Sequence, residues 1–205
     1  SVFACQQISG VADIMGSLMD SYYMKDFTVD KAMDRAKEYV GLLAPYVKIW
    51  EGANEINGDW GGPGAASMAW STLAYLKMQH LLTATTYFFG TFENPANDMF
   101  TWIANNPLPK SDYVLVSYYD EADLDWPAIF SRLGQVFPGA GLGIGEFGTT
   151  VSSKKAALVR KFYTLPVKHP NYIGGGFYWY FRQDCCPYTK RLYATLAKTW
   201  RSAII

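Results

Sequence analysis

Two glutamates that follow apolar segments are the side chains of this sequence best suited to chemistry. Glu55 closes the stretch Lys48-Ile-Trp-Glu-Gly-Ala-Asn-Glu, and Glu146 follows Gly141-Leu-Gly-Ile-Gly. A carboxylate at the end of a strand lies at the rim of a parallel α/β fold, where such folds keep their active sites. Two carboxylates that face each other are the minimum equipment for cleaving a glycosidic bond. Either glutamate alone could equally be an ion-pair partner or a solvated rim residue.

The elements that would position these glutamates alternate between short apolar strands and amphipathic helices. Such alternation is typical of βαβ units and a parallel sheet. Helices are expected at residues 28–43, with Thr28 as N-cap, and at 65–80, 97–105, 126–137, 153–165 and 189–202. Residues 10–23 are ambiguous, with a helix as one interpretation. Strands are expected at residues 2–7, 47–52, 82–89, 113–118, 141–146 and 172–180.

The number of these units predicts an incomplete barrel. Eight βα units close a TIM-type barrel of about 250 residues, whereas this chain of 205 residues provides about six. The predicted fold class is therefore α/β, a (β/α) barrel of the TIM type that lacks about two units. We expect it to form a single domain over residues 1–205.

Charge and composition narrow the classes of partner. The 18 basic and 18 acidic residues balance, so nothing indicates binding to nucleic acid or to an anionic membrane surface. No apolar segment approaches the roughly 20 residues of a transmembrane helix. Seven Trp and fifteen Tyr could stack on sugar rings or simply fill a barrel. The first residues do not resemble a signal peptide, and localisation stays open, with a secreted or extracellular protein favoured.

No spacing of cysteines or histidines indicates a metal site, and no cofactor is expected. A disulfide between Cys5 and either Cys185 or Cys186 and three free thiols are equal alternatives. The acidic cluster within residues 120–125 lacks the spacing of a known calcium loop, so a solvated rim is the better interpretation.

Four motifs, taken in order, resemble those of the clan A glycoside hydrolases. They are Trp50-Glu-Gly-Ala-Asn-Glu, Val116-Ser-Tyr-Tyr, Gly143-Ile-Gly-Glu-Phe-Gly and Gly176-Phe-Tyr-Trp-Tyr. Members of this clan are retaining enzymes on an eight-stranded β/α barrel. Two predicted strands separate the first motif from the third, which is the number that the clan has between its fourth and seventh strands.

This resemblance implies a role for each matching residue. Glu55 resembles the acid/base of the clan and Glu146 its nucleophile. Asn54 matches the residue that holds the sugar 2-hydroxyl. The aromatic residue that contacts the nucleophile would be Tyr118 or Tyr119, and the platform beneath the reacting sugar would be Trp179.

The chemistry that the resemblance implies requires two carboxyl groups about 5–5.5 Å apart. Glu146, with a tyrosine hydroxyl donating to it, would stay ionised and attack the sugar. Its charge would raise the pKa of Glu55, which would keep its proton until the glycosyl-enzyme forms. We therefore expect an endo-acting enzyme that cleaves β-glycosidic bonds in a polysaccharide or oligosaccharide by double displacement.

Further aromatic and acidic side chains are candidates for binding such a substrate. These are Trp60 and Trp126, which are expected on rim loops, and Asp184, which follows the last strand. Three other tryptophans fall in predicted helices and are expected in the core: Trp70, Trp102 and Trp200.

One departure from the clan keeps a second interpretation open. The clan's first two strands have no counterpart, which leaves predicted sheet edges near residues 2–7 and 172–180. Exposed edges invite a homodimer, which could supply the missing strands. The alternative function is a carbohydrate-binding relative or barrel fragment with little or no turnover. The sequence leaves the identity and linkage of the sugar undefined.

Overall fold

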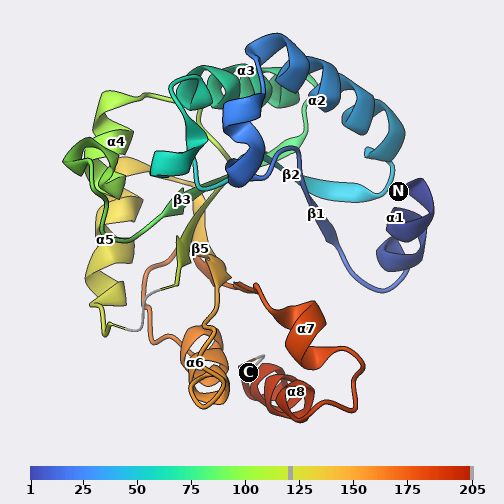
Figure 1. Cartoon of the computed structure of the whole chain (residues 1–205), viewed down its shortest axis with the longest axis vertical. Helices are drawn as coiled ribbons and strands as arrows, with labels where there is room; N and C mark the ends of the chain where they lie inside the picture. The colour runs from blue at the N-terminus through green and yellow to red at the C-terminus, as the bar shows by residue number, and fades with distance from the viewer. Residues whose placement is uncertain (120–121, 204–205) are drawn as a thin grey trace. The chain divides into compact units, whose positions relative to one another are not determined.

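The computed structural model describes residues 1–119 and 122–203 and divides into two compact units, residues 1–114 and 115–205. Both units consist of parallel β-strands that alternate with α-helices (Figure 1). The predicted α/β class is therefore confirmed. That the whole chain folds as a single domain stays a prediction. In the described residues, no helix is both long enough and apolar enough to span a membrane.

The first unit contains three hydrogen-bonded parallel strands and the start of a fourth. Strand β1 pairs with β2, and β2 pairs with β3. Short 3-10 helices interrupt the connections: η1 (Ser21–Asp26), η2 (Asp59–Gly61) and η3 (Pro95–Asn97). The regular elements are α1 (Val2–Ser9), β1 (Ile14–Ser17), α2 (Val29–Leu43), β2 (Val47–Ala53), α3 (Ala65–Met78), β3 (Leu82–Phe88), α4 (Met99–Asn105) and β4 (Tyr113–Tyr118), which continues into the second unit.

Strand β2 is fixed in the first unit by close packing against α3. The hydroxyl of Thr72 donates to the carbonyl of Gly52 at 2.7 Å. A Cβ atom on Gly52 would lie only 2.7 Å from Leu73 Cδ2, so any larger residue here would force the Leu73 side chain to move. Trp50, a residue of this strand, is almost fully buried and belongs to the hydrophobic core of the unit. The strand that precedes Glu55 is therefore held rigidly.

The second unit contains the rest of β4 and a strand that pairs with two short segments. Strand β5 pairs in parallel with β6 through Leu142 and Tyr172, and with β7 through Glu146 and Phe177. Stacked aromatic rings fill its core, with the centroids of Phe147 and Phe162 4.8 Å apart. The elements are α5 (Trp126–Val136), β5 (Gly141–Phe147), α6 (Lys155–Tyr163), β6 (Tyr172–Gly174), β7 (Phe177–Tyr178), α7 (Phe181–Cys185) and α8 (Arg191–Ala203).

The N-terminal segment differs from the prediction. Residues 2–7 were expected as a strand but lie in α1, whose N-cap is Ser1 and which buries none of its side chains. The first strand is instead β1, inside the ambiguous range 10–23. A four-residue strand has too few residues to show a periodicity, and its pairing with β2 is a tertiary contact that local sequence does not reveal. The edge strand of this unit is therefore β1.

The last predicted strand is also divided. Residues 172–178 form β6 and β7, which are joined by three glycines, the first of them the last residue of β6: Gly174, Gly175 and Gly176 have φ angles of 72°, 93° and 126°. Glycine adopts such positive angles readily, whereas other residues rarely do. The predicted dimer through the sheet edges stays a prediction.

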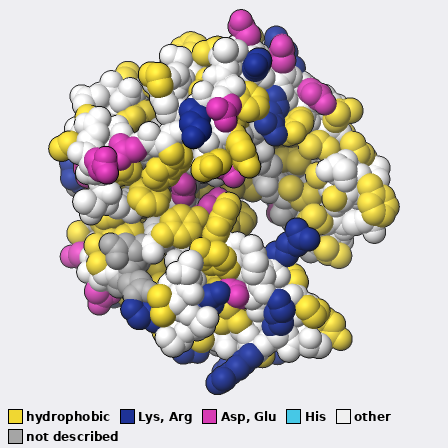
Figure 2. All heavy atoms as spheres, in the orientation of Figure 1, with side chains coloured by type: hydrophobic (Ala, Val, Ile, Leu, Met, Phe, Trp, Pro, Cys, Tyr) yellow, Lys and Arg dark blue, Asp and Glu magenta, His cyan; other side chains and the backbone are white. Residues whose placement is uncertain are grey.

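Other expectations are confirmed. Strand β4 has the predicted bounds, and Thr28 caps α2 by accepting from the backbone N–H of Lys31 at 3.3 Å. Acidic and basic side chains are interspersed over the helices of the first unit (Figure 2), in line with the balanced charge of the sequence. All three cysteines are free thiols in the structure, which is one of the two alternatives.

Candidate active site

Glu55 lies in the first unit, two residues after the end of β2, in a loop of unusual backbone conformation. Its φ angle is 42°, a left-handed value that is uncommon for a residue other than glycine. Such strained positions are frequent at functional sites. The residue is only 8 % exposed, and Asn54 beside it is equally buried. Glu55 is therefore not a solvated rim residue.

A chain of two hydrogen bonds reaches the carboxylate of Glu55. The indole N–H of Trp60 donates to Ser21 Oγ at 2.8 Å, and the hydroxyl of Ser21 donates to Glu55 Oε2 at 3.4 Å. Since the indole occupies an acceptor position on Ser21, it orients the hydroxyl proton toward Glu55. No local signal marks Ser21, which stands 34 residues before the glutamate in sequence.

Trp60, predicted to form a sugar subsite, is half-buried in η2. Its ring meets Phe88 edge to face with centroids 5.2 Å apart. It also covers Gly58, where a Cβ atom would lie 2.3 Å from the indole. The ring is thus held in one orientation by two neighbours and a hydrogen bond. Its role as a subsite stays a prediction.

Asn57 is a positioning residue that the sequence reasoning missed. Its amide nitrogen donates to the carbonyl of Phe88 at 2.8 Å and to that of Asn97 at 2.9 Å. Its amide oxygen accepts from the backbone N–H of Phe88 at 2.8 Å. The side chain is 1 % exposed. It therefore ties the loop that carries Glu55 to the end of β3 and to η3.

The substitution Asn57→Ala is expected to lower the free energy of unfolding by about 3 kcal/mol, because three buried hydrogen bonds worth roughly 1 kcal/mol each are lost. Urea denaturation of the wild-type and variant proteins measures this difference. The control is Asn105→Ala, which removes an exposed amide and should change the value by less than about 0.5 kcal/mol. A loss below about 1 kcal/mol for Asn57→Ala would contradict the assignment.

Glu51 is a buried carboxylate on strand β2 of the first unit. It is 4 % exposed, and the hydroxyl of Thr86 donates a short hydrogen bond to it. The pairing of β2 with β3 shifts register between Glu51 and Ala53. Strand alternation therefore does not carry over from Glu51 to Glu55.

Glu146 lies in the second unit, near the end of β5, and its carboxylate is held by a tyrosine. The hydroxyl of Tyr119 donates to Glu146 Oε2 at 2.5 Å. The backbone N–H of Glu146 donates to Ser117 Oγ at 3.2 Å. A hydrogen bond donated to a charged oxygen is stronger than one donated to a neutral oxygen. The Tyr119 hydroxyl therefore favours the ionised form of the Glu146 carboxylate. Both partners come from β4 and the residue that follows it.

Tyr118, the other candidate for this contact, points to the core. Its hydroxyl donates to the carbonyl of Ala122 at 3.1 Å, and its ring packs edge to face on Trp126 with centroids 5.3 Å apart. Neighbouring residues at the end of a strand point to opposite faces. Of the two tyrosines, Tyr119 is thus the one that contacts Glu146.

Trp126 and Trp179 differ sharply in exposure. Trp126 begins α5 and is 2 % exposed, packed against Phe130 and Phe162. This burial corrects the expectation of a rim subsite, because no face of the indole is open to a sugar. Trp179, directly after β7, is 49 % exposed and so has a face that could act as the expected platform. Sequence position did not separate the two, because burial depends on packing partners distant in sequence.

Asp184, a predicted substrate-binding residue, is held by two other side chains. Lys155 Nζ contacts its two oxygens at 2.8 and 2.6 Å, and the hydroxyl of Tyr178 donates at 2.6 Å. Burial alone would raise the pKa of Asp184, but the hydrogen bonds from Lys155 and Tyr178 lower it overall. Burial and the neighbouring Asp184 raise the pKa of Tyr178 well above its usual value. The predicted role in substrate binding stays a prediction.

This cluster predicts a pH-dependent stability. Because the folded-state pKa of Asp184 lies below its unfolded value of about 3.9, its contribution is complete above that value and is lost as the pH falls through the folded pKa. Asp184→Asn should be about 1–3 kcal/mol less stable than the wild type at pH 7, with a gap that narrows below about pH 4.

Urea denaturation at several pH values between neutral and acidic conditions measures this gap. The matched control is Asp13→Asn, which removes the exposed ion pair with Lys48 at 2.7 Å and should change stability by less than about 1 kcal/mol. A gap for Asp184→Asn that stays constant into acidic solution would contradict the assignment.

Two acidic side chains of the predicted cluster at residues 120–125 have partners of their own. Within residues 1–119 and 122–203, no group of three or more potential ligands gathers. Asp123 pairs with Lys161 at 2.7 Å, and Asp125 caps α5 by accepting from the N–H of Ala128 at 3.0 Å. Asp120 and Glu121, which belong to the same predicted cluster, lie outside the described residues.

Comparison with known proteins adds one structural likeness. No protein-family model and no curated protein matches the sequence. The structure is similar to the crystal structure of a GH128 (subgroup I) endo-β-1,3-glucanase from Amycolatopsis mediterranei in complex with laminaritriose. The TM-score is 0.56 at 10 % sequence identity, and the match covers 93 % of this chain and 82 % of that chain. This chain therefore has an α/β fold like that of a TIM-barrel-like glycoside hydrolase.

Proposed function

We propose that this chain is a retaining glycoside hydrolase that cleaves internal linkages of a β-1,3-glucan. The observation that carries the proposal is Glu146, a carboxylate near the end of β5 that accepts a 2.5 Å hydrogen bond from Tyr119. A glycosidase nucleophile must stay ionised until it attacks, and a donated hydrogen bond favours the ionised form. Support also comes from the likeness to an endo-β-1,3-glucanase.

In the first step, one carboxylate oxygen of Glu146 forms a bond to the anomeric carbon of the glucan. The bond between that carbon and the glycosidic oxygen breaks, and the leaving oxygen takes a proton from Glu55. In the second step, Glu55, now ionised, takes a proton from water. The water oxygen replaces Glu146 at the anomeric carbon, and the configuration is retained overall.

The surroundings of Glu55 suit an acid/base. Its burial removes it from bulk water, and the hydroxyl of Ser21 donates a hydrogen bond to it. Desolvation favours the protonated form of a carboxylic acid, which is the form required before the first step. Asn54 precedes it and is proposed to hold the 2-hydroxyl of the reacting sugar, a contact that strengthens in the transition state.

The choice of β-1,3-glucan comes from the structural likeness. The similar enzyme is an endo-β-1,3-glucanase and its structure contains laminaritriose. A long polysaccharide is met outside the cell, so we also propose that the protein acts there.

The test is hydrolysis of laminarihexaose, with cellohexaose and mannohexaose as controls for linkage and sugar. We expect shorter β-1,3-linked products from laminarihexaose at a rate at least tenfold above either control. Proton NMR of the first products should show the β-anomer, as retention requires. Absence of hydrolysis on every β-glycan, or initial release of the α-anomer, would overturn the proposal.

The alternative is a carbohydrate-binding relative with little turnover. It is favoured by the number of strands, since the described residues provide fewer than the eight of a closed barrel. Binding of laminarihexaose in calorimetry without any product over days would select this alternative.

A further inference from the structure

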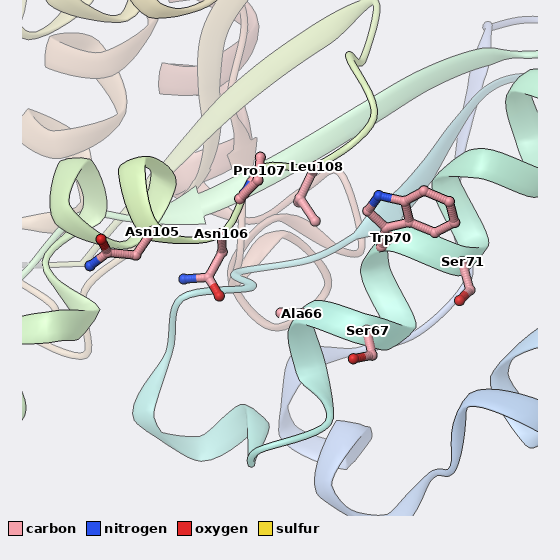
Figure 3. Close-up of a pocket in the computed structure, with 8 residues that line it drawn as sticks. All are labelled: Ala66, Ser67, Trp70, Ser71, Asn105, Asn106, Pro107 and Leu108. Atoms are coloured by element: carbon pink, nitrogen blue, oxygen red, sulfur yellow. The ribbon is translucent and has the colours of Figure 1, made fainter.

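A pocket in the first unit lies between α3 and the segment that follows α4 (Figure 3). Its volume is about 360 Å³, within the range of roughly 300–1,000 Å³ that small-molecule sites occupy. None of the candidate catalytic carboxylates lines it. The lining residues are Ala66, Ser67, Trp70, Ser71, Asn105, Asn106, Pro107 and Leu108.

Trp70 is the feature of this pocket that needs an explanation. It was expected in the core but is 53 % exposed, in contrast to Trp102, which is 7 % exposed. Ser67 and Ser71 stand three residues before and one residue after it on α3, so hydroxyls border the indole on the same wall of the pocket. A large apolar ring with two serine hydroxyls in the same lining offers the flat face and the polar edge that a sugar ring requires.

The opposite wall supplies amides. Asn105 is exposed, and the amide nitrogen of Asn106 donates to the carbonyl of Trp102 at 2.9 Å. That bond fixes the amide so that its oxygen lies on the side toward α3 (Figure 3). An amide oxygen is a hydrogen-bond acceptor that suits the hydroxyl groups of a ligand.

The lining also defines the charge of the ligand. Among the residues that the structure describes, no Lys, Arg, Asp or Glu lines this pocket. A charged ligand would enter without a counter-charge and would lose hydration energy that nothing replaces. Hydroxyls, amides and one indole face fit a neutral ligand with many hydroxyl groups.

A second pocket of about 490 Å³ continues from the first. The two share Ala66, Asn105 and Asn106. The second is also lined by Ile56 and Gly58, from the loop that directly follows Glu55. The hollow surface of this unit thus extends from that loop to Trp70, which suits an elongated ligand better than a compact one.

We propose that the Trp70 pocket is a second glycan-binding site, separate from the catalytic carboxylates, which holds a neutral β-glucan chain. One pyranose ring stacks on the indole of Trp70, and its hydroxyls bond to Ser67, Ser71 and Asn106. The choice of β-glucan rests on the proposed function. The site tethers a polymer while the catalytic residues work on it, so it contributes little to the cleavage of a short oligosaccharide.

Binding is tested in the Glu146→Gln background, which prevents loss of the ligand by hydrolysis. Retention on insoluble β-1,3-glucan and calorimetry with laminarihexaose are compared for this parent and three further variants. Trp70→Ala should weaken retention at least tenfold, whereas Trp70→Phe should restore part of it. The matched control is Met78→Ala, which removes an exposed apolar side chain from the end of the same helix and should bind as the parent does. Circular dichroism checks that each variant is folded.

Catalysis gives the second readout, with Glu146 intact. Trp70→Ala should leave hydrolysis of laminaritriose unchanged and lower hydrolysis of the insoluble polymer at least threefold. Equal retention of Trp70→Ala and its parent, or no retention of the parent, would overturn the inference. Trp70-dependent binding by a protein without hydrolytic activity would support this site and reject the proposed function, so the two can be judged separately.

Discussion

Glu146→Gln should reduce hydrolysis of laminarihexaose on the order of 10⁴-fold or more, the scale observed when an enzyme loses a covalent nucleophile. The amide keeps the size of the side chain and can still meet the Tyr119 hydroxyl, but it cannot form the glycosyl ester. Initial rates from reducing-end release measure the loss. The matched control is Glu93→Gln, an exposed carboxylate of a loop in the first unit, which should retain full activity.

Addition of azide tests whether the lost activity is that of the nucleophile. In Glu146→Ala, azide fits the space of the lost carboxylate and attacks an aryl β-glucoside from the same side. The product should be the α-glycosyl azide, with inverted configuration. A variant that keeps more than about a tenth of the wild-type rate, or that yields only the β-azide, would remove Glu146 from the nucleophile role.

The second large effect is expected for Glu55→Gln, which removes the general acid and base. Such a group typically accelerates a reaction 10²–10⁴-fold, so the rate of hydrolysis should fall by a similar factor. The loss should depend on the leaving group. A glucan needs its departing oxygen protonated, so its cleavage should fall by the larger factor. The dinitrophenolate of a dinitrophenyl β-glucoside is a good leaving group that departs without a proton. Formation of the glycosyl-enzyme from this substrate should therefore fall by less than about tenfold.

The pH profile and azide separate Glu55 from Glu146. For the wild type, kcat/KM should decline at alkaline pH as the acid loses its proton, and this limb should disappear in Glu55→Gln. With Glu55→Ala, azide should replace water in the second step and give the β-glycosyl azide. A uniform loss for all leaving groups, with the alkaline limb preserved, would contradict the acid/base role.

The sequence predicted the parts of this protein whose signal is local. Strand β4 has the expected bounds, because a continuous apolar run between polar residues marks a buried strand. The same signal located Glu55 in the loop after β2 and Glu146 near the end of β5. The helix that begins after Thr28 was recognised from its capping residue.

The parts that escaped prediction depend on contacts across long sequence separations. Ser21 meets Glu55, and Asn57 meets Phe88 and Asn97, through pairs 31 to 40 residues apart. Burial of tryptophans was missed for the same reason. Trp126 was expected to be open but is enclosed by Phe130 and Phe162, whereas Trp70 was expected to be enclosed and is open.

The glycine segment between β6 and β7 limits how this chain can vary. Gly174, Gly175 and Gly176 all have positive φ angles, and Gly176 is also crowded, since a Cβ atom there would meet the ring of Phe147 at 2.7 Å. If these codons were randomised and the library were selected for folded protein, glycine should be recovered at 176 almost without exception. Evolution can therefore reshape the exposed apolar side chains on either side of this segment, Ile173 and Phe177, but it has little freedom in the three glycines that join them.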